Sequence, residues 1–186
     1  MSIEMLTPLF TPTTQVSADD SQHEVRLTVS DDVQAILHTD QHLLVINKTY
    51  DSGTVSYMLR CDNHKILLAR LALVLGEANP ELNGLPPTAV KTLSRLQSDW
   101  TVRRSALDSP WFDITCNHDE NLTYSTTYPP HDAVLSRLFN VDTTTLIDAL
   151  INEGRNGPLL AALRSTEEAQ DTQRIIQQKA LIDTRE

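Results

Sequence analysis

The chain has 186 residues, of which 40% are hydrophobic, 22% are charged and only 5% are aromatic. This length and composition are typical of one globular domain whose core is built mainly from aliphatic side chains. The formal charge of −10 repels phosphate backbones and anionic lipid headgroups. We therefore expect neither a nucleic-acid partner nor a membrane partner.

The first segment, residues 1–22, is predicted to be a flexible N-terminal arm. It contains Pro8 and Pro12, which remove amide donors and favour extended backbone in the residues before them. It has no basic leader and no long apolar run of the signal-peptide type. With only two cysteines in the chain, these features predict a cytoplasmic protein with reduced thiols.

Residues 23–61 have the pattern of an antiparallel sheet of about four strands. Val25, Leu27 and Val29 alternate with polar residues, which is typical of a half-buried strand. Three further strand-like runs follow after short connections, one of which is the hairpin signal Asp51-Ser52-Gly53. Short connections between neighbouring strands favour an antiparallel meander.

Two helices are predicted next, at residues 66–79 and 87–104. The first is apolar on nearly every side, and a helix of that kind is buried, so we expect it to pack against the sheet. The second places Val90, Leu93, Leu96 and Trp100 at steps of three and four residues, which form one stripe on a helix.

The remainder of the chain is predicted to contain short strands within 111–128 and then helices over 130–164. A final, mostly polar helix is expected at 165–186, after a single domain that spans 23–164, and is a candidate for projecting from that domain. The predicted fold class is α+β, with an N-terminal antiparallel β-meander of about four strands packed on a buried helix and a mainly helical C-terminal half.

One short stretch, CNHDENLTYSTTYPPHD at 116–132, is the richest in reactive side chains. Cys116 with His118 or His131 would make a thiol–imidazole pair, although no glycine-rich turn or helix start follows Cys116 to activate it. Ordinary structural roles at a strand end, a charged turn and a helix entry explain the same residues. We interpret the stretch as a loop and keep the thiol centre as an alternative.

The other motifs in the sequence do not match known metal or cofactor sites, so we expect neither a metal nor a cofactor. Cys61 and His64, with Cys116 and His118, would supply four zinc ligands, but their spacing does not match the usual pairs. The sequence Asp51-Ser52-Gly53-Thr54 resembles one half of an aspartic-protease site, but the residues before it are polar. Neither phosphate-binding glycine loops nor a serine nucleophile elbow occurs.

The sequence thus predicts a non-enzymatic intracellular protein-binding module, such as an adaptor, assembly factor or chaperone-like protein. It is expected to bind protein partners and is a candidate for homo-oligomerisation. Its expected partner-binding residues are apolar positions of the two terminal segments: Met5, Leu6, Leu9, Phe10, Ile175, Ile176, Leu181 and Ile182. The alternative is a small thiol- or metal-dependent enzyme centred on Cys116, His118 and His131.

Overall fold

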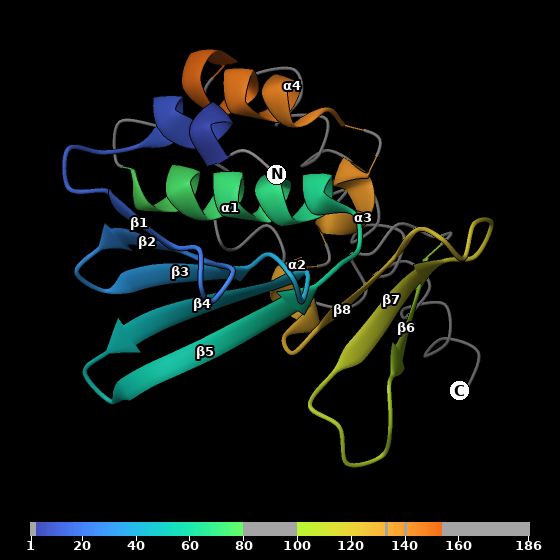
Figure 1. The fold of residues 1–186 in the computed structure, drawn as a ribbon. Helices are drawn as coiled ribbons and strands as arrows, with labels where there is room; N and C mark the ends of the chain where they lie inside the picture. The colour runs from blue at the N-terminus through green and yellow to red at the C-terminus, as the bar shows by residue number, and fades with distance from the viewer. Residues whose placement is uncertain (1–2, 80–99, 133, 140, 154–186) are drawn as a thin grey trace, which may run out of the picture.

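The computed structural model describes residues 3–79, 100–132, 134–139 and 141–153. These residues form one eight-stranded antiparallel sheet with the strand order β1-β2-β3-β4-β5-β8-β7-β6. Figure 1 shows helices α1 and α4 stacked on one side of strands β1–β5. The described part of the chain is therefore mostly β-structure with helical layers on one face.

The first five strands form a meander in chain order. Strands β6, β7 and β8 join it through β8, which pairs with β5. The strand bounds are β1 Gln15–Asp19, β2 Glu24–Ser30, β3 Val33–His38, β4 Leu43–Tyr50, β5 Gly53–Arg60, β6 Trp100–Arg104, β7 Phe112–Cys116 and β8 Thr123–Thr126.

The helices are short, apart from α1 (His64–Ala78). The described part of the chain also contains a 3₁₀ helix η1 (Ile3–Leu9), helices α2 (Pro129–Asp132), α3 (Leu135–Leu138) and α4 (Thr143–Asp148), and a π-helical turn η4 (Ala149–Glu153). Among the described helices, none has the length and apolar character needed to cross a membrane.

Helix α1 is the centre of the core. Its first turn is capped by Asn63, whose side chain accepts a hydrogen bond from the Lys65 backbone N–H at 3.1 Å. Residues 66–76 are all buried, because the sheet covers one side of the helix, and η1 and α4 contact it as well. At Gly76 an added Cβ would lie 3.2 Å from Cδ2 of Leu150, so glycine permits the close approach of η4.

The predicted fold class is wrong, because the described residues form an eight-stranded antiparallel sheet with a few short helices, and those in the C-terminal half are not mainly helical. The expected strands at 23–61 and within 111–128 and the expected buried helix at 66–79 do occur, but β1 and β6 also join the sheet and bring it to eight strands. The prediction of a helix at 87–104 is wrong for its last residues, because Trp100–Arg104 forms strand β6 and pairs with β7. Its other residues lie outside the described part of the chain.

The pattern at β6 was ambiguous for a physical reason. Trp100 fits a helical stripe with Leu96, but Trp100 and Val102 also alternate with Thr101 and Arg103, as in a strand with one buried face. Tertiary packing decides between the two, because Trp100 lies with Tyr124 and Phe139 in an aromatic cluster with ring centroids 5.0 to 6.1 Å apart.

The helices expected over 130–164 are short pieces, and 154–164 lies outside the described residues. Pro129 and Pro130 start α2, α3 ends before Phe139, and Asp142 caps α4 by accepting from the Thr144 N–H. The predicted arm contains η1 and β1. The final helix expected at 165–186 is outside the described part.

Candidate functional site

The side of the sheet opposite α1 carries polar and charged residues. One row crosses all eight strands, and the register places its members side by side as Asp19, Glu24, His38, Leu43, Arg60, Ser125, Asp113 and Arg103. Glu24 forms an ion pair with Arg26 on the same strand, and the Arg60 guanidinium lies 5.0 Å from the centroid of the Trp111 ring. Such a row is typical of a face in contact with water.

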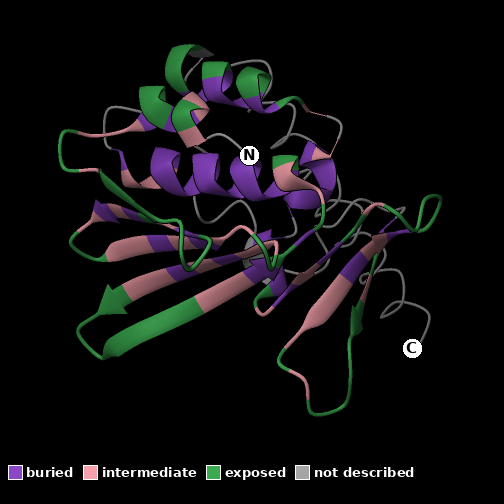
Figure 2. Cartoon of the chain, in the orientation of Figure 1, coloured by how far each residue is buried: buried purple, intermediate pink, exposed green. Residues whose placement is uncertain are grey.

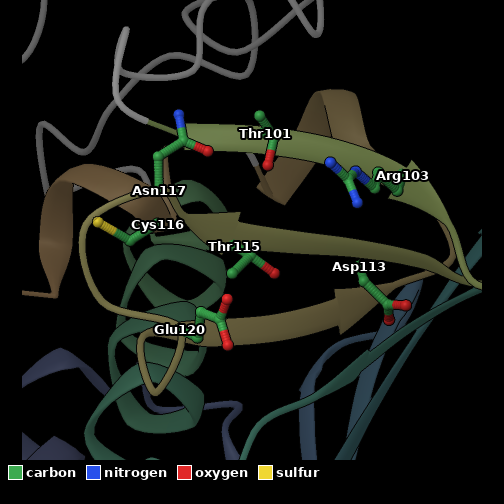
Figure 3. Close-up of a pocket in the computed structure, with 7 residues that line it drawn as sticks. All are labelled: Thr101, Arg103, Asp113, Thr115, Cys116, Asn117 and Glu120. Atoms are coloured by element: carbon green, nitrogen blue, oxygen red, sulfur yellow. The ribbon is translucent and has the colours of Figure 1, made fainter.

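A hollow of about 430 Å³ lies at the β6–β7 end of this open face. Figure 3 shows its lining, in which Thr101 and Arg103 come from β6 and Asp113 and Thr115 from β7. The remaining lining residues, Cys116, Asn117 and Glu120, belong to the end of β7 and the loop before β8.

The lining of the hollow consists mainly of polar side chains that can form hydrogen bonds. Asp113 already accepts a hydrogen bond from Ser125 at 2.6 Å, and the hydroxyl groups of Thr115 and Thr123 lie 2.8 Å apart. One arginine, two carboxylates and two threonine hydroxyl groups line the hollow, and charge interactions at such a solvent-accessible site are weak. The lining residues have the character of a polar contact surface.

The structure places Cys116 and His118 of the predicted thiol centre in different surroundings. Cys116 is buried and lies directly opposite Trp100 in the β6–β7 ladder, on the core side of the sheet. Its sulfur points away from Asp113 and Arg103 in Figure 3. His118 is exposed in the following loop, and the side chain of His131 is not among those described. The alternative enzyme function stays a prediction.

The other cysteine, Cys61, and the nearby His64 also pack against other residues of the fold. Cys61 is buried, its Sγ lies 3.5 Å from the Thr123 carbonyl oxygen, and burial raises the pKa of its thiol to about 11. His64 packs edge-on against His42 with ring centroids 4.6 Å apart, and His42 is 3.0 Å from an Asp62 carboxylate oxygen. Among the described residues, no group of three or more potential ligands is placed to hold a metal ion.

An exposed apolar surface occurs where β5 separates from β8. We call it the tyrosine patch and define it as Tyr50, Val55, Tyr57 and Tyr128. Strands β5 and β8 pair only at Leu59–Thr126 and Arg60–Ser125; they diverge beyond these pairs (Figure 1). Figure 2 shows the early part of β5 as exposed.

The members of the tyrosine patch contact one another. The rings of Tyr57 and Tyr128 lie 5.4 Å apart between centroids. Burial, followed by a hydrogen bond with Tyr50, raises the pKa of Tyr57 to about 12. Val55 is two residues from Tyr57 on the same face of β5. The exposed fractions are 49% for Tyr50, 43% for Val55 and 41% for Tyr128, so these large side chains are solvent-exposed together.

The predicted partner-binding residues of the N-terminal arm pack on the chain itself. Leu6 and Leu9 are fully buried in the core, and Met5 and Phe10 are partly buried against it. Of these four, Met5 and Phe10 retain surface for a partner. The C-terminal set Ile175, Ile176, Leu181 and Ile182 lies outside the described residues, so its role stays a prediction.

Sequence reasoning did not find the tyrosine patch. Tyr50 and Tyr57 flank a hairpin, whereas Tyr128 follows β8 much later in the chain. A partial signal was present, because Tyr50 ends β4 and Tyr128 follows β8 by two residues in a chain with very few aromatics. Their convergence depends on the β5–β8 pairing, which no local pattern encodes.

No family model and no curated protein matches this chain. It is similar in structure to Rv3902c from M. tuberculosis, with a TM-score of 0.60 and 11% sequence identity, over 84% of this chain and 92% of that one. At this identity the likeness concerns the fold alone.

Proposed function

We propose that the chain is a non-enzymatic protein-binding module and that its partner docks on the tyrosine patch. The observation that carries the proposal is the exposure of Tyr50, Val55 and Tyr128, with Tyr57 between them. Tyrosine is enriched in protein interfaces, because its ring buries a large area at a small cost in conformational entropy and its hydroxyl group still forms hydrogen bonds.

The hollow on the open face is a less favourable docking site than the tyrosine patch. Its lining is polar and exposed, so a partner there would gain little from removing apolar surface from water. The tyrosine patch offers apolar rings and hydroxyl groups at the same place, which is the composition of an interface centre.

Charge complementarity indicates the chemistry of the partner. The chain carries a formal charge of −10, and Asp51 follows Tyr50 directly in the β4–β5 turn. A basic protein surface would be attracted to the chain as a whole, and its arginine side chains can stack on tyrosine rings. We therefore propose a basic protein partner.

The test is quantitative affinity purification from the native cell, comparing the wild type with the double variant Tyr50→Ala/Tyr128→Ala. We expect recovery of the main partner to fall by about tenfold or more, since buried interface tyrosines often contribute roughly 2 kcal/mol each. The matched control is Thr101→Ala/Thr115→Ala in the hollow, which should recover the partner at the wild-type level.

Both double variants change exposed or partly exposed side chains, so circular dichroism should show an unchanged fold. Undiminished recovery with Tyr50→Ala/Tyr128→Ala would show that the partner docks elsewhere. If the control variant alone lost the partner, the hollow rather than the tyrosine patch would be the docking site.

A further inference from the structure

Strand β1 forms an open edge of the sheet. It pairs with β2 on one side, stands at the end of the strand order, and has no described strand on its other side. All five of its residues are exposed. The outward backbone N–H and C=O groups of such a strand are donors and acceptors for one more strand.

This edge lacks three of the features that prevent pairing, namely proline, lysine and a β-bulge. Within Gln15–Asp19 there is no proline and no lysine, and the register with β2 runs through five consecutive pairs without a bulge. Val16 is 47% exposed, which adds an apolar side chain to the open edge. The opposite edge strand differs, since β6 ends in Arg103 and Arg104.

We infer that β1 pairs with β1 of a second copy of this chain, antiparallel and about a two-fold axis at Ser17. An isologous interface must place each residue opposite its symmetry mate in the register. With Ser17 opposite Ser17, Val16 lies opposite Ala18 and Gln15 lies opposite Asp19. All five residues of each strand then take part.

This register is self-complementary on both faces of the sheet. Val16 and Ala18 lie beside Leu27 and Val25 of β2, so on the face covered by α1 the apolar side chains of the two copies meet. On the other face, each Gln15 amide opposes an Asp19 carboxylate, which can accept a hydrogen bond from it. No two like charges stand opposite each other, so cross-strand repulsion is avoided.

The first test is sedimentation velocity of the full chain from micromolar to near-millimolar concentration, because five paired residues make a small interface. We expect the wild type to shift from 20.8 kDa towards twice that mass, and Val16→Lys to stay monomeric. Val55→Lys is the matched control, since Val55 is exposed to a similar extent, 43% against 47%, and it should dimerise like the wild type.

A wild type that stays at 20.8 kDa would overturn the inference. So would a Val16→Lys variant that dimerises normally, or a Val55→Lys variant that loses dimerisation as fully as Val16→Lys. The dimer is independent of the proposed function: Val16→Lys should still bind the basic partner, and Tyr50→Ala/Tyr128→Ala should still dimerise.

A second test places a cysteine on the axis. Directly opposed residues of an antiparallel pair are close enough for a disulfide, and the native Cys61 and Cys116 are buried. Under mild oxidation Ser17→Cys should give a disulfide-linked dimer, whereas Ser56→Cys, an exposed serine of β5, should remain largely monomeric. Equal cross-linking of the two variants would overturn the register.

Discussion

Asp132 is held in the core by three polar contacts. Its carboxylate accepts a hydrogen bond from Arg70 Nε at 2.7 Å and another from the Thr126 hydroxyl group, and its backbone carbonyl accepts from the Tyr124 hydroxyl at 2.7 Å. Arg70 and Asp132 are 2% and 3% exposed. The pair therefore connects α1, β8 and α2 in the buried core, where an unpaired charge is costly.

We predict that Asp132→Asn destabilises the chain by roughly 3–5 kcal/mol, because it leaves the Arg70 guanidinium buried without a countercharge. Urea unfolding measures the change. Asp31→Asn, in an exposed turn, is the control and should alter stability by less than about 0.5 kcal/mol. A loss below about 1 kcal/mol for Asp132→Asn would contradict this role of the ion pair.

The sequence places Asp132 in the first turn of a helix, and it does lie in α2. The sequence did not predict the pairing of Asp132 with Arg70, because Arg70 only interrupts the apolar run of residues 66–75 and shows no partner there. The two residues are brought together only when α2 follows β8 across the end of the sheet. Long-range pairs of this kind have no local signature.

At the scale of elements, we expect the stability of the start of α1 to depend on pH. His64 is the first residue of the helix, its Nδ1 is buried without a hydrogen-bond partner in the structure, and His42 lies against its ring. Burial, and then the neighbouring His42, lowers the pKa of His64. A positive charge at a helix N-terminus is also unfavourable, so the folded state favours the neutral ring.

The direction of the pH effect follows from this lowered pKa. The unfolded chain takes up the His64 proton at a higher pH than the folded chain, so stability falls as pH drops from about 7 through the ordinary histidine range. Asp62 faces His42 at 3.0 Å and partly offsets the charge. We predict that His64→Gln makes the melting temperature fall less steeply between about pH 7.5 and about pH 5.5.

Differential scanning calorimetry at several pH values measures this slope. The control is His118→Gln, because His118 is exposed in the β7–β8 loop, and it should follow the wild type. A His64→Gln variant with the wild-type slope would show that other groups determine the acid sensitivity of the fold.

The elements themselves differ in how far the sequence predicted them. Strict alternation identified the strands of 23–61, and the continuous apolar run identified α1, because both patterns have one physical interpretation. Trp100–Arg104 fits both a helix stripe and a strand, and only its pairing with β7 decides. The short helices after Thr126 reflect capping by Asp142 and the two prolines at 129–130, which interrupt the periodic pattern.

At the scale of the whole molecule, the acidic charge and the tyrosine patch have different roles in binding. In the proposed complex, a net charge of −10 would attract a basic partner over a distance, which affects the rate of association. The rings of the patch would hold the bound partner, which affects the rate of dissociation. The net charge follows from the composition, whereas the tyrosine patch can be found only once the pairing of β5 with β8 is known.

We predict that the association rate constant with the captured partner falls by about tenfold or more between about 0.05 and about 0.5 M salt, while the dissociation rate changes much less. Tyr50→Ala/Tyr128→Ala should show the reverse, with faster dissociation at an almost unchanged association rate. Biolayer interferometry measures both constants. An association rate that is insensitive to salt would argue against a basic partner.

The most direct measurement is photo-cross-linking from a benzophenone amino acid placed at position 50 in one protein and at position 101 in another. The first position lies in the tyrosine patch and the second lines the hollow on the open face. Irradiation in the native cell should join the partner to the chain from position 50 and not from position 101. Cross-linking from position 101 alone would contradict docking on the tyrosine patch.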